Sequence, residues 1–518
     1  MKSSEMEARS LRRLIAVRPR RLRLKMRHLA LPVLSFVALA LIAGPVEASA
    51  ASSGGPDGVE GAATAIERQL EEMGVAQAAY VVISGEQQQV AGFGAASGDT
   101  PFVIGSVSKS FTALAILQLV EQGIVELDAP VTDYIDWFTT ADSTAPITLR
   151  HLLNQTSGLS TLDGSRIVFT PEISLEERVR SIENYELVSE PGAEFNYSNL
   201  NYAILGLIVQ EVSGQDYGEF VEEEIFAPLG MDHSYSDFAQ ARADGLAQGT
   251  ITVFGFPISL RHTAIPGFAP DGYLISTAAD MAAYARFQVG DGSFEGRRLI
   301  SAENMALMHT PAALSQGGEH LDHYAMGWRT GSIDGKELIG HDGNTFGFHA
   351  NVALIPDIDA AVVVLMARNG VMVKGPETAG LEALIGGMPQ VSRAPTIAWI
   401  ILDAVTALLV LASILYVMRR RRRLRMDPPQ TPRRWPAVLQ IAAGFTIGAV
   451  ILLVSLMSGG IDVVVFRLLL ALAPDMTIVA SAMALLLVAG GIASLVERRS
   501  AVLRRAMEPS LTRKAIHA

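Results

Sequence analysis

The chain has 518 residues, of which 49% are hydrophobic, a formal net charge of −12 and no cysteine. Its length and apolar content allow a large buried core, while the missing cysteines exclude disulfides, thiolate metal ligands and a cysteine nucleophile. The charge is uneven, because an acidic middle lies between two basic ends. The acidic middle disfavours nucleic acid as a partner, and the basic ends suit a chain that crosses an anionic membrane with its middle outside.

The N-terminal 50 residues have the pattern of a secretory signal peptide. Residues 1–28 are rich in arginine, residues 29–43 are almost wholly apolar, and the small residues at 48–50 offer a cleavage site. An uncleaved signal anchor is the alternative, although the apolar run is short for a membrane span. Residues 51–59 contain Gly, Ser and Pro and are expected to form a linker.

Residues 60–388 are expected to form one soluble domain that mixes helices and strands. Apolar residues recur at helical spacing over residues 110–122, and this helix is expected to end at Gly123. Residues 348–356 and 360–367 are expected to be consecutive strands. The apolar run of the second strand is nearly continuous, which predicts burial on both faces.

Three apolar segments near the C-terminus are long enough to span a bilayer. The predicted spans are residues 396–418, 437–457 and 476–496. Arginine-rich segments at 419–436 and 497–518 follow the first and third spans, and the positive-inside rule places both in the cytoplasm. Residues 458–475 are expected to form a short outer or interfacial segment. The large domain would then lie outside the membrane, in agreement with the signal peptide.

Ser106 and Lys109 form the first motif that carries chemistry. They are three residues apart at the start of the predicted helix, so they would share one face of it. A serine hydroxyl needs a base to become a nucleophile, and a desolvated lysine can serve because, unlike arginine, it can lose its proton. Only six of the 41 basic residues are lysines, and Lys109 alone has a serine three positions before it. A solvated lysine beside a capping serine is the simpler alternative.

Tyr197-Ser198-Asn199 is the second motif, the only Tyr-x-Asn among eleven tyrosines. A tyrosine can relay a proton to a leaving group, and an asparagine can orient the lysine and bond a substrate amide. Taken alone, the motif is more simply a turn with a packed tyrosine.

His341-Asp342-Gly343 is the third motif, the only His-x-Gly among ten histidines. Gly343 would let a substrate backbone approach closely along the edge of a strand. We count His341 among the candidate catalytic residues, and Asp342 and Gly343 among those that bind the substrate. Taken alone, His341 is a loop histidine.

In this order, and about a hundred residues apart, the three motifs resemble the family of class C β-lactamases, serine D-Ala-D-Ala carboxypeptidases and related esterases. The resemblance covers about residues 60–385. Further segments that look like this family are Thr100–Lys109, Leu127–Val131, Thr148–Gly158, Tyr324–Trp328 and Gly340–Gly347.

The resemblance implies an α+β fold, in which an antiparallel sheet flanked by helices lies beside a helical subdomain, here followed by the three transmembrane helices. It also implies that Ser106 attacks a carbonyl, that Lys109 and Tyr197 move protons and that Asn199 orients. The backbone N–H groups of Ser106 and Asn344 would form the oxyanion hole. No metal or organic cofactor is implied.

The third motif departs from the Lys-Thr-Gly of β-lactamases at two positions. His341 is mostly neutral at neutral pH unless perturbed, and Asp342 replaces a hydroxyl residue that would bond a substrate carboxylate. If the Asp342 side chain faced the substrate, two like charges about 4 Å apart would repel by roughly 4 kcal/mol at an effective dielectric near 20. We therefore expect a poor β-lactamase and carboxypeptidase, although strand alternation could turn Asp342 away.

Residues 319–323, Glu-His-Leu-Asp-His, hold possible metal ligands. No cysteine or His-Glu-x-x-His pattern supports a zinc site there. A polar surface loop before Tyr324 is expected instead, with no bound metal.

The sequence as a whole predicts a membrane-anchored serine hydrolase on the outer side of a bacterial cytoplasmic membrane. It would form an acyl-enzyme with an ester, amide or peptide-like substrate, and its other contact would be the membrane through the three C-terminal helices. The competing interpretation is a sensor or receptor whose hydrolase-like domain binds cell-wall fragments or β-lactams without turnover. The intact set of Ser106, Lys109, Tyr197 and Asn199 favours the enzyme.

Overall fold

A computed structural model provides the structure of the chain. It describes residues 58–141, 145–161, 173–253, 256–260, 266–315, 320–369 and 375–387, with eight scattered residues between 411 and 492. The predicted signal peptide, most of the linker and, apart from those scattered positions, the three predicted spans lie outside the described residues. Within the described residues, no helix combines the length and the apolar character that a membrane span requires.

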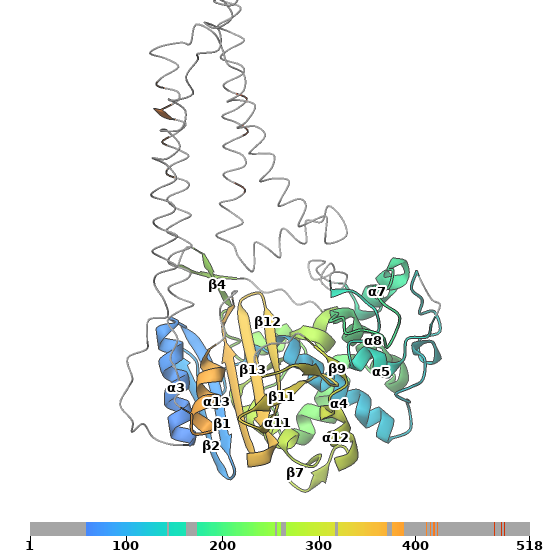
Figure 1. Cartoon of the computed structure of the whole chain (residues 1–518), viewed down its shortest axis with the longest axis horizontal. Coiled ribbons are helices and arrows are strands. Elements are labelled where there is room, and N and C mark those ends of the chain that lie inside the picture. The colour runs from blue at the N-terminus through green and yellow to red at the C-terminus, as the bar shows by residue number, and fades with distance from the viewer. Residues whose placement is uncertain are drawn as a thin grey trace, which may run out of the picture. The chain divides into compact units, whose positions relative to one another are not determined.

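The centre of the domain is an eight-stranded antiparallel sheet with the strand order β2-β1-β14-β13-β12-β11-β10-β9 (Figure 1). Its strands are β1 (Gln77–Ser84), β2 (Gln87–Gly94), β9 (Ala313–Leu314), β10 (His323–Tyr324), β11 (Arg329–Ile333), β12 (Lys336–Thr345), β13 (Phe348–Ile355) and β14 (Ala360–Met366). The two strands predicted from the sequence are confirmed as β13 and β14, each one residue shorter than expected. All seven residues of β14 are buried, as its apolar run predicts.

The two faces of the sheet are covered by different helices. On one face lie α3 (Val59–Glu72) and α13 (Pro376–Leu384), which pack side by side (Figure 1). Alternate residues of β1 and β14 point to that face, among them Tyr80 and Val364, while their neighbours point to the larger core on the other face. There α11 (Ala278–Val289) packs on β14.

A helical part of the domain joins the sheet on the side of the larger core. Its helices are α4 (Ser108–Glu121), α5 (Leu149–Leu153), α7 (Leu175–Arg180), α8 (Asn199–Ser213), α9 (Tyr217–Val221), α10 (Phe238–Ala243) and α12 (Ala302–His309). The predicted helix is confirmed as α4; it begins two residues before the predicted start, and Gly123 follows it in a left-handed conformation at φ 70°.

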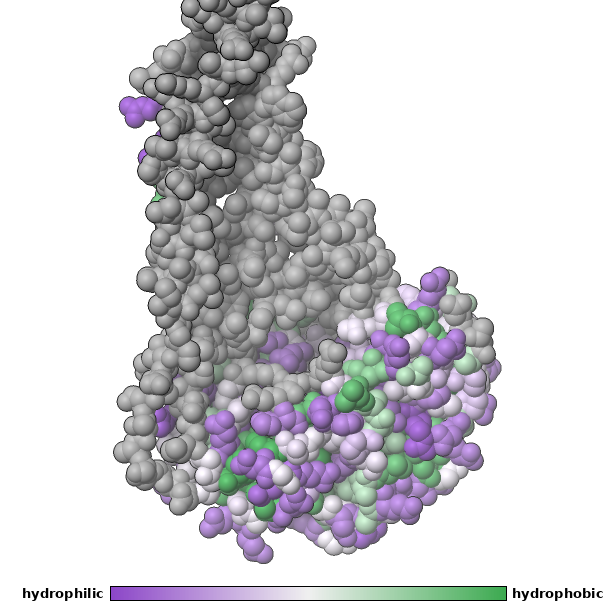
Figure 2. Space-filling model, viewed as in Figure 1, coloured by the Kyte–Doolittle hydropathy of each residue, from purple (hydrophilic) through white to green (hydrophobic). Residues whose placement is uncertain are grey.

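Short elements complete the fold. Two small sheets pair β3 (Phe102–Val103) with β6 (Ile275–Ser276) and β7 (Ser293–Phe294) with β8 (Arg297–Arg298). A third orders β15 (Arg368–Asn369), β4 (Thr250–Val253) and β5 (Phe256–Ser259). The visible face of the domain in Figure 2 is largely polar with separate apolar patches. The expected α+β fold is confirmed, with a helical part beside a helix-flanked antiparallel sheet.

Candidate active site

Ser106 lies at the junction of the sheet and the helical part. It occupies the short turn η1 (Gly105–Val107) that leads from β3 into α4. Gly105 takes φ 56°, a left-handed value that glycine adopts without strain. The Ser106 side chain is half-buried, whereas Lys109, in the first turn of α4, is wholly buried. This arrangement leaves the hydroxyl accessible and removes its neighbouring amine from water.

The Lys109 amine bridges three parts of the chain. Its Nζ donates to Ser106 Oγ at 3.0 Å, to Asn199 Oδ1 at 2.8 Å and to the backbone carbonyl of Asp271. Three acceptors match the three donors of an ammonium group. The predicted pairing of Ser106 with Lys109 and the predicted contact of Asn199, the first residue of α8, with the lysine are both present.

Aromatic side chains surround this amine. Lys109 Nζ stands 5.1 Å from the ring centroid of Tyr197, and the His341 ring lies 6.3 Å from that of Tyr197. The backbone carbonyl of Asp342 accepts from His341 Nδ1 at 2.7 Å, so Nε2 is left to accept from the Tyr324 hydroxyl at 3.4 Å. The second and third motifs therefore meet at Lys109.

His341 is held as a neutral ring. Burial lowers its pKa to about 3, and the nearby charges of Arg329 and Lys109 act in the same direction. The residue that replaces the lysine of the β-lactamase motif is therefore uncharged at neutral pH. It can accept or donate a hydrogen bond but does not add a cation to the site.

Gly343 serves the fold in a different way from the one expected. A Cβ atom on Gly343 would stand 1.8 Å from the carbonyl oxygen of Ile104, so its missing side chain makes room for the chain's own backbone. The approach of a substrate along this strand stays a prediction. A Cβ atom on Gly105 would likewise stand 2.6 Å from the backbone nitrogen of Asn344. The two glycines let the backbone of Asn344 lie close to the turn that carries Ser106. The role of the Asn344 N–H in an oxyanion hole stays a prediction.

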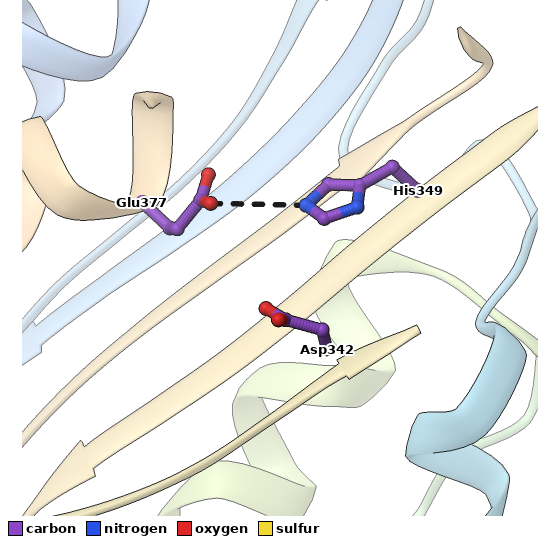
Figure 3. Close-up of side chains that lie close together, drawn as sticks. All are labelled: Asp342, His349 and Glu377. Atoms are coloured by element: carbon purple, nitrogen blue, oxygen red, sulfur yellow. Dashed lines mark ion pairs between the residues drawn. The ribbon is translucent and has the colours of Figure 1, made fainter. Parts of the chain in front are cut away.

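The expectation that Asp342 repels a substrate carboxylate is wrong in its premise. Successive side chains of β12 point to opposite faces, and His341 takes the face of the Ser106 site. Asp342 points to the face covered by α13, toward His349 and Glu377 (Figure 3). Its Oδ1 accepts from Asn351 Nδ2 at 2.7 Å. The like-charge penalty therefore does not arise at the site.

Three further residues at the site escaped the sequence analysis. Asp271, in the turn η8 (Ala269–Tyr273), binds Lys109 through its backbone carbonyl, for which no side-chain pattern exists. Its carboxylate pairs with Arg178, in α7, at 2.5 Å and 3.1 Å. The half-buried guanidinium of Arg329 lies 5.7 Å from the Tyr197 ring centroid. None of these three residues lies in a motif that the sequence analysis identified. Tyr324, which also lines the site, belongs to the segment Tyr324–Trp328 that resembles the family.

The histidine-rich segment before Tyr324 is only partly described. The imidazole of His323 and the carboxylate of Asp322 pair at 2.9 Å, and both side chains are exposed. Glu319 lies outside the described residues. The described part is a polar surface segment, as expected.

The fold and the cluster of Ser106, Lys109 and Asn199 define the class of serine β-lactamase-related proteins. The family model named Beta-lactamase matches residues 62–386, and the chain belongs to this family.

Two relatives and one solved structure illustrate the similarity. Penicillin-binding protein 4 of Amycolatopsis lactamdurans is 30% identical over 287 residues, which cover 53% of this chain and 74% of that protein. Protein flp of Staphylococcus aureus strain MW2 is 29% identical over 277 residues, which cover 53% of this chain and 54% of flp, so the chain spans about half the length of that relative. The structure of the octameric penicillin-binding protein homologue from Pyrococcus abyssi superposes with a TM-score of 0.58 at 27% identity, covering 63% of this chain and 77% of that chain.

Proposed function

We propose that the chain is a serine hydrolase that forms an acyl-enzyme on Ser106. The observation that carries the proposal is the wholly buried Lys109 amine, whose Nζ lies 3.0 Å from Ser106 Oγ. This distance is within the reach that a general base needs. A receptor that binds its ligand without a covalent bond has no need of a base beside the hydroxyl, so the remaining alternative is a receptor that is acylated but does not turn over.

In the proposed reaction, Lys109 acts as a neutral amine that has first given one proton to solvent, so that two N–H groups still bond Asn199 and Asp271. Its Nζ then takes the Ser106 proton as Oγ attacks the carbonyl carbon of the substrate. The backbone N–H groups of Ser106 and Asn344 stabilise the negative oxygen that develops. Tyr197 passes a proton to the leaving group as its bond to the carbonyl carbon breaks, which leaves the acyl ester on Ser106. A water molecule then attacks this ester and gives a proton to Lys109. As the bond between Ser106 Oγ and the carbonyl carbon breaks, Lys109 returns that proton to Oγ, which regenerates Ser106 and releases the free acid.

The charges around the site favour a substrate that carries an anion near the cleaved bond. Arg329 lies 5.7 Å and 5.5 Å from the ring centroids of Tyr197 and Tyr324, and its Nη1 donates to Ser315 Oγ at 3.1 Å. Among the ion pairs found in the described part of the chain, none joins a carboxylate to Arg329. Guanidinium groups bind carboxylates through paired hydrogen bonds. We therefore propose that Arg329 binds a carboxylate of an ester, amide or peptide-like substrate. This proposal replaces the expectation, drawn from Asp342, that a substrate carboxylate would be repelled.

We further propose that the domain works on the outer side of a bacterial cytoplasmic membrane. The apolar N-terminal segment, the three apolar C-terminal segments and the arginine-rich loop and tail support this placement. α13 ends at Leu384, about 12 residues before the first predicted span, and a linker of that length reaches at most about 40 Å. Because such a linker would keep the domain close to the bilayer, we propose that its substrates lie at or near the membrane surface.

A hydrolysis panel tests the proposed function. The purified chain in detergent is assayed with a cephalosporin, a D-Ala-D-Ala peptide and short-chain p-nitrophenyl esters, each beside the Ser106→Ala variant. We expect turnover of at least one class by the wild type and none by the variant. Stoichiometric acylation without turnover across the panel would favour a receptor instead.

A further inference from the structure

A second group of polar side chains converges on the opposite face of the sheet from Ser106. It consists of Asp342 on β12, His349 on β13 and Glu377 on α13 (Figure 3). One ligand atom of each lies within 4.8 Å of the others, and it is the one such group of three among the described residues. The side chains of His349 and Glu377 are only 1% and 5% exposed.

The hydrogen bonds of the His349 ring indicate which of its two nitrogens carries a proton. Its Nδ1 lies 2.9 Å from Asn344 Oδ1, which can only accept, so Nδ1 carries a proton. Figure 3 shows the other ring nitrogen, Nε2, facing the Glu377 carboxylate. In a neutral ring this nitrogen carries the lone pair. Within the described structure, neither His349 Nε2 nor Glu377 Oε2 has a hydrogen-bond partner. Buried polar atoms without partners are rare and costly, so a ligand or a proton between these two side chains would stabilise them.

The spacing of these atoms favours a cation over a direct hydrogen bond. His349 Nε2 and Glu377 Oε1 are 3.8 Å apart, which is well beyond the usual hydrogen-bond range. Two ligands of a tetrahedral zinc ion with bonds of about 2.1 Å are separated by about 3.4 Å. A contraction of a few tenths of an ångström would bring this pair to that geometry. The carboxylate of Asp342 adds a second negative charge, which a divalent ion would balance.

We propose that Asp342, His349 and Glu377 bind a divalent cation of the zinc class. One imidazole nitrogen with two carboxylate oxygens is a ligand set that suits zinc and neighbouring transition ions. The ion would join α13 to β12 and β13. It would also fix the His349 ring, which is hydrogen-bonded to the Asn344 side chain. The part of β12 that lies beside Ser106 would therefore be less mobile. The proposal does not depend on hydrolysis at Ser106.

Zinc binding by the full chain tests the proposal. The detergent-purified protein is stripped with EDTA and titrated with Zn²⁺, with bound metal measured by mass spectrometry and affinity by calorimetry. We expect one Zn²⁺ per chain, with affinity at least 100-fold weaker in His349→Gln and in Glu377→Gln. At a zinc concentration 100 times the dissociation constant, the folding equilibrium constant of the wild type should rise about 100-fold. The absence of a tight site in the wild type would overturn the proposal.

Two control variants separate this site from the exposed histidine segment and from the Ser106 site. The double variant Asp322→Asn, His323→Gln alters the exposed histidine segment and should bind zinc like the wild type; loss of binding there, with His349→Gln unaffected, would refute the assignment. Ser106→Ala should also bind normally, so that failure of the proposed hydrolase and failure of this site are distinguishable.

If the His349 or Glu377 variants do not fold, the zinc-edge X-ray absorption spectrum of the loaded wild type decides. A single imidazole in a nitrogen and oxygen shell is expected, and several imidazoles would contradict the proposal.

Discussion

The buried ion pair between Arg178 and Asp271 gives a sharp prediction about both stability and activity. The two side chains are 0% and 2% exposed, and Arg178 also donates to the carbonyl of Gly267 at 2.6 Å and stacks 3.7 Å from the ring centroid of Phe268. Arg178→Met keeps most of the volume but leaves the Asp271 carboxylate buried without its cation. Breaking one side of such a pair costs about 3–5 kcal/mol of unfolding free energy. Because the Asp271 carbonyl binds Lys109, we also expect a loss of kcat.

Urea denaturation followed by tryptophan fluorescence measures the stability loss, since Trp328 is fully buried. The double variant Arg178→Met, Asp271→Leu removes both charges and should recover most of the lost stability. The matched control is Arg298→Met, which breaks an exposed pair with Asp291 and should cost about 1 kcal/mol or less. A cost for Arg178→Met as small as that of the control, with kcat unchanged, would refute the positioning role of the pair.

Four further predictions address the site and the core. Lys109→Arg should reduce kcat nearly as much as Lys109→Ala, because arginine keeps the charge but cannot accept the Ser106 proton; recovery of most of the rate would leave the lysine an electrostatic group only. Gly343→Ala should lower both stability and activity, because its methyl group would meet the Ile104 carbonyl at 1.8 Å, and a fully active, stable variant would disprove the close packing. Arg329→Gln should raise KM for an ester with a carboxylate near the cleaved bond and leave a matched neutral ester unaffected; equal effects on both would remove the proposed anion contact. Burial lowers the pKa of His309 to about 4, so as pH falls from about 6.5 to 4 the unfolded state takes up the proton first and His309 contributes a loss of up to about 3 kcal/mol of unfolding free energy. His341, whose pKa burial also lowers, contributes a further loss in the same direction, so His309→Gln should remove the His309 share alone; urea titrations at several pH values measure this share, and an unchanged pH dependence would refute it.

Local patterns predicted the parts of the fold that local physics decides. The apolar runs that became α4, β13 and β14 are decided by which side chains leave water, so their bounds were predicted to within two residues. The meeting of Ser106, Lys109 and Asn199 was also predicted, although Lys109 and Asn199 are 90 positions apart in sequence, because the three motifs in their order resemble the β-lactamase-related family. Their catalytic roles stay predictions.

Other features depend on packing that no local pattern encodes. The direction of Asp342 is set by which face β12 presents to α13, and a shift of one residue would reverse it. Asp271 contacts Lys109 through a backbone carbonyl, which any residue could supply. His349 on β13 and Glu377 on α13 lie close together on the face of the sheet opposite Ser106, and no sequence motif links them. Each of these features required the three-dimensional structure.

Covalent labelling of Ser106 coupled to turnover tests the central claim most directly. The full chain is treated with a fluorophosphonate, the labelled peptide is identified by mass spectrometry, and the remaining turnover of a chromogenic ester is measured in the same samples. We expect one label, on Ser106, and loss of turnover in proportion to labelling, with neither label nor turnover in Ser106→Ala. Undiminished ester hydrolysis by Ser106→Ala, or complete labelling of a wild type that turns over no ester, would contradict the assignment of this chain as a serine hydrolase.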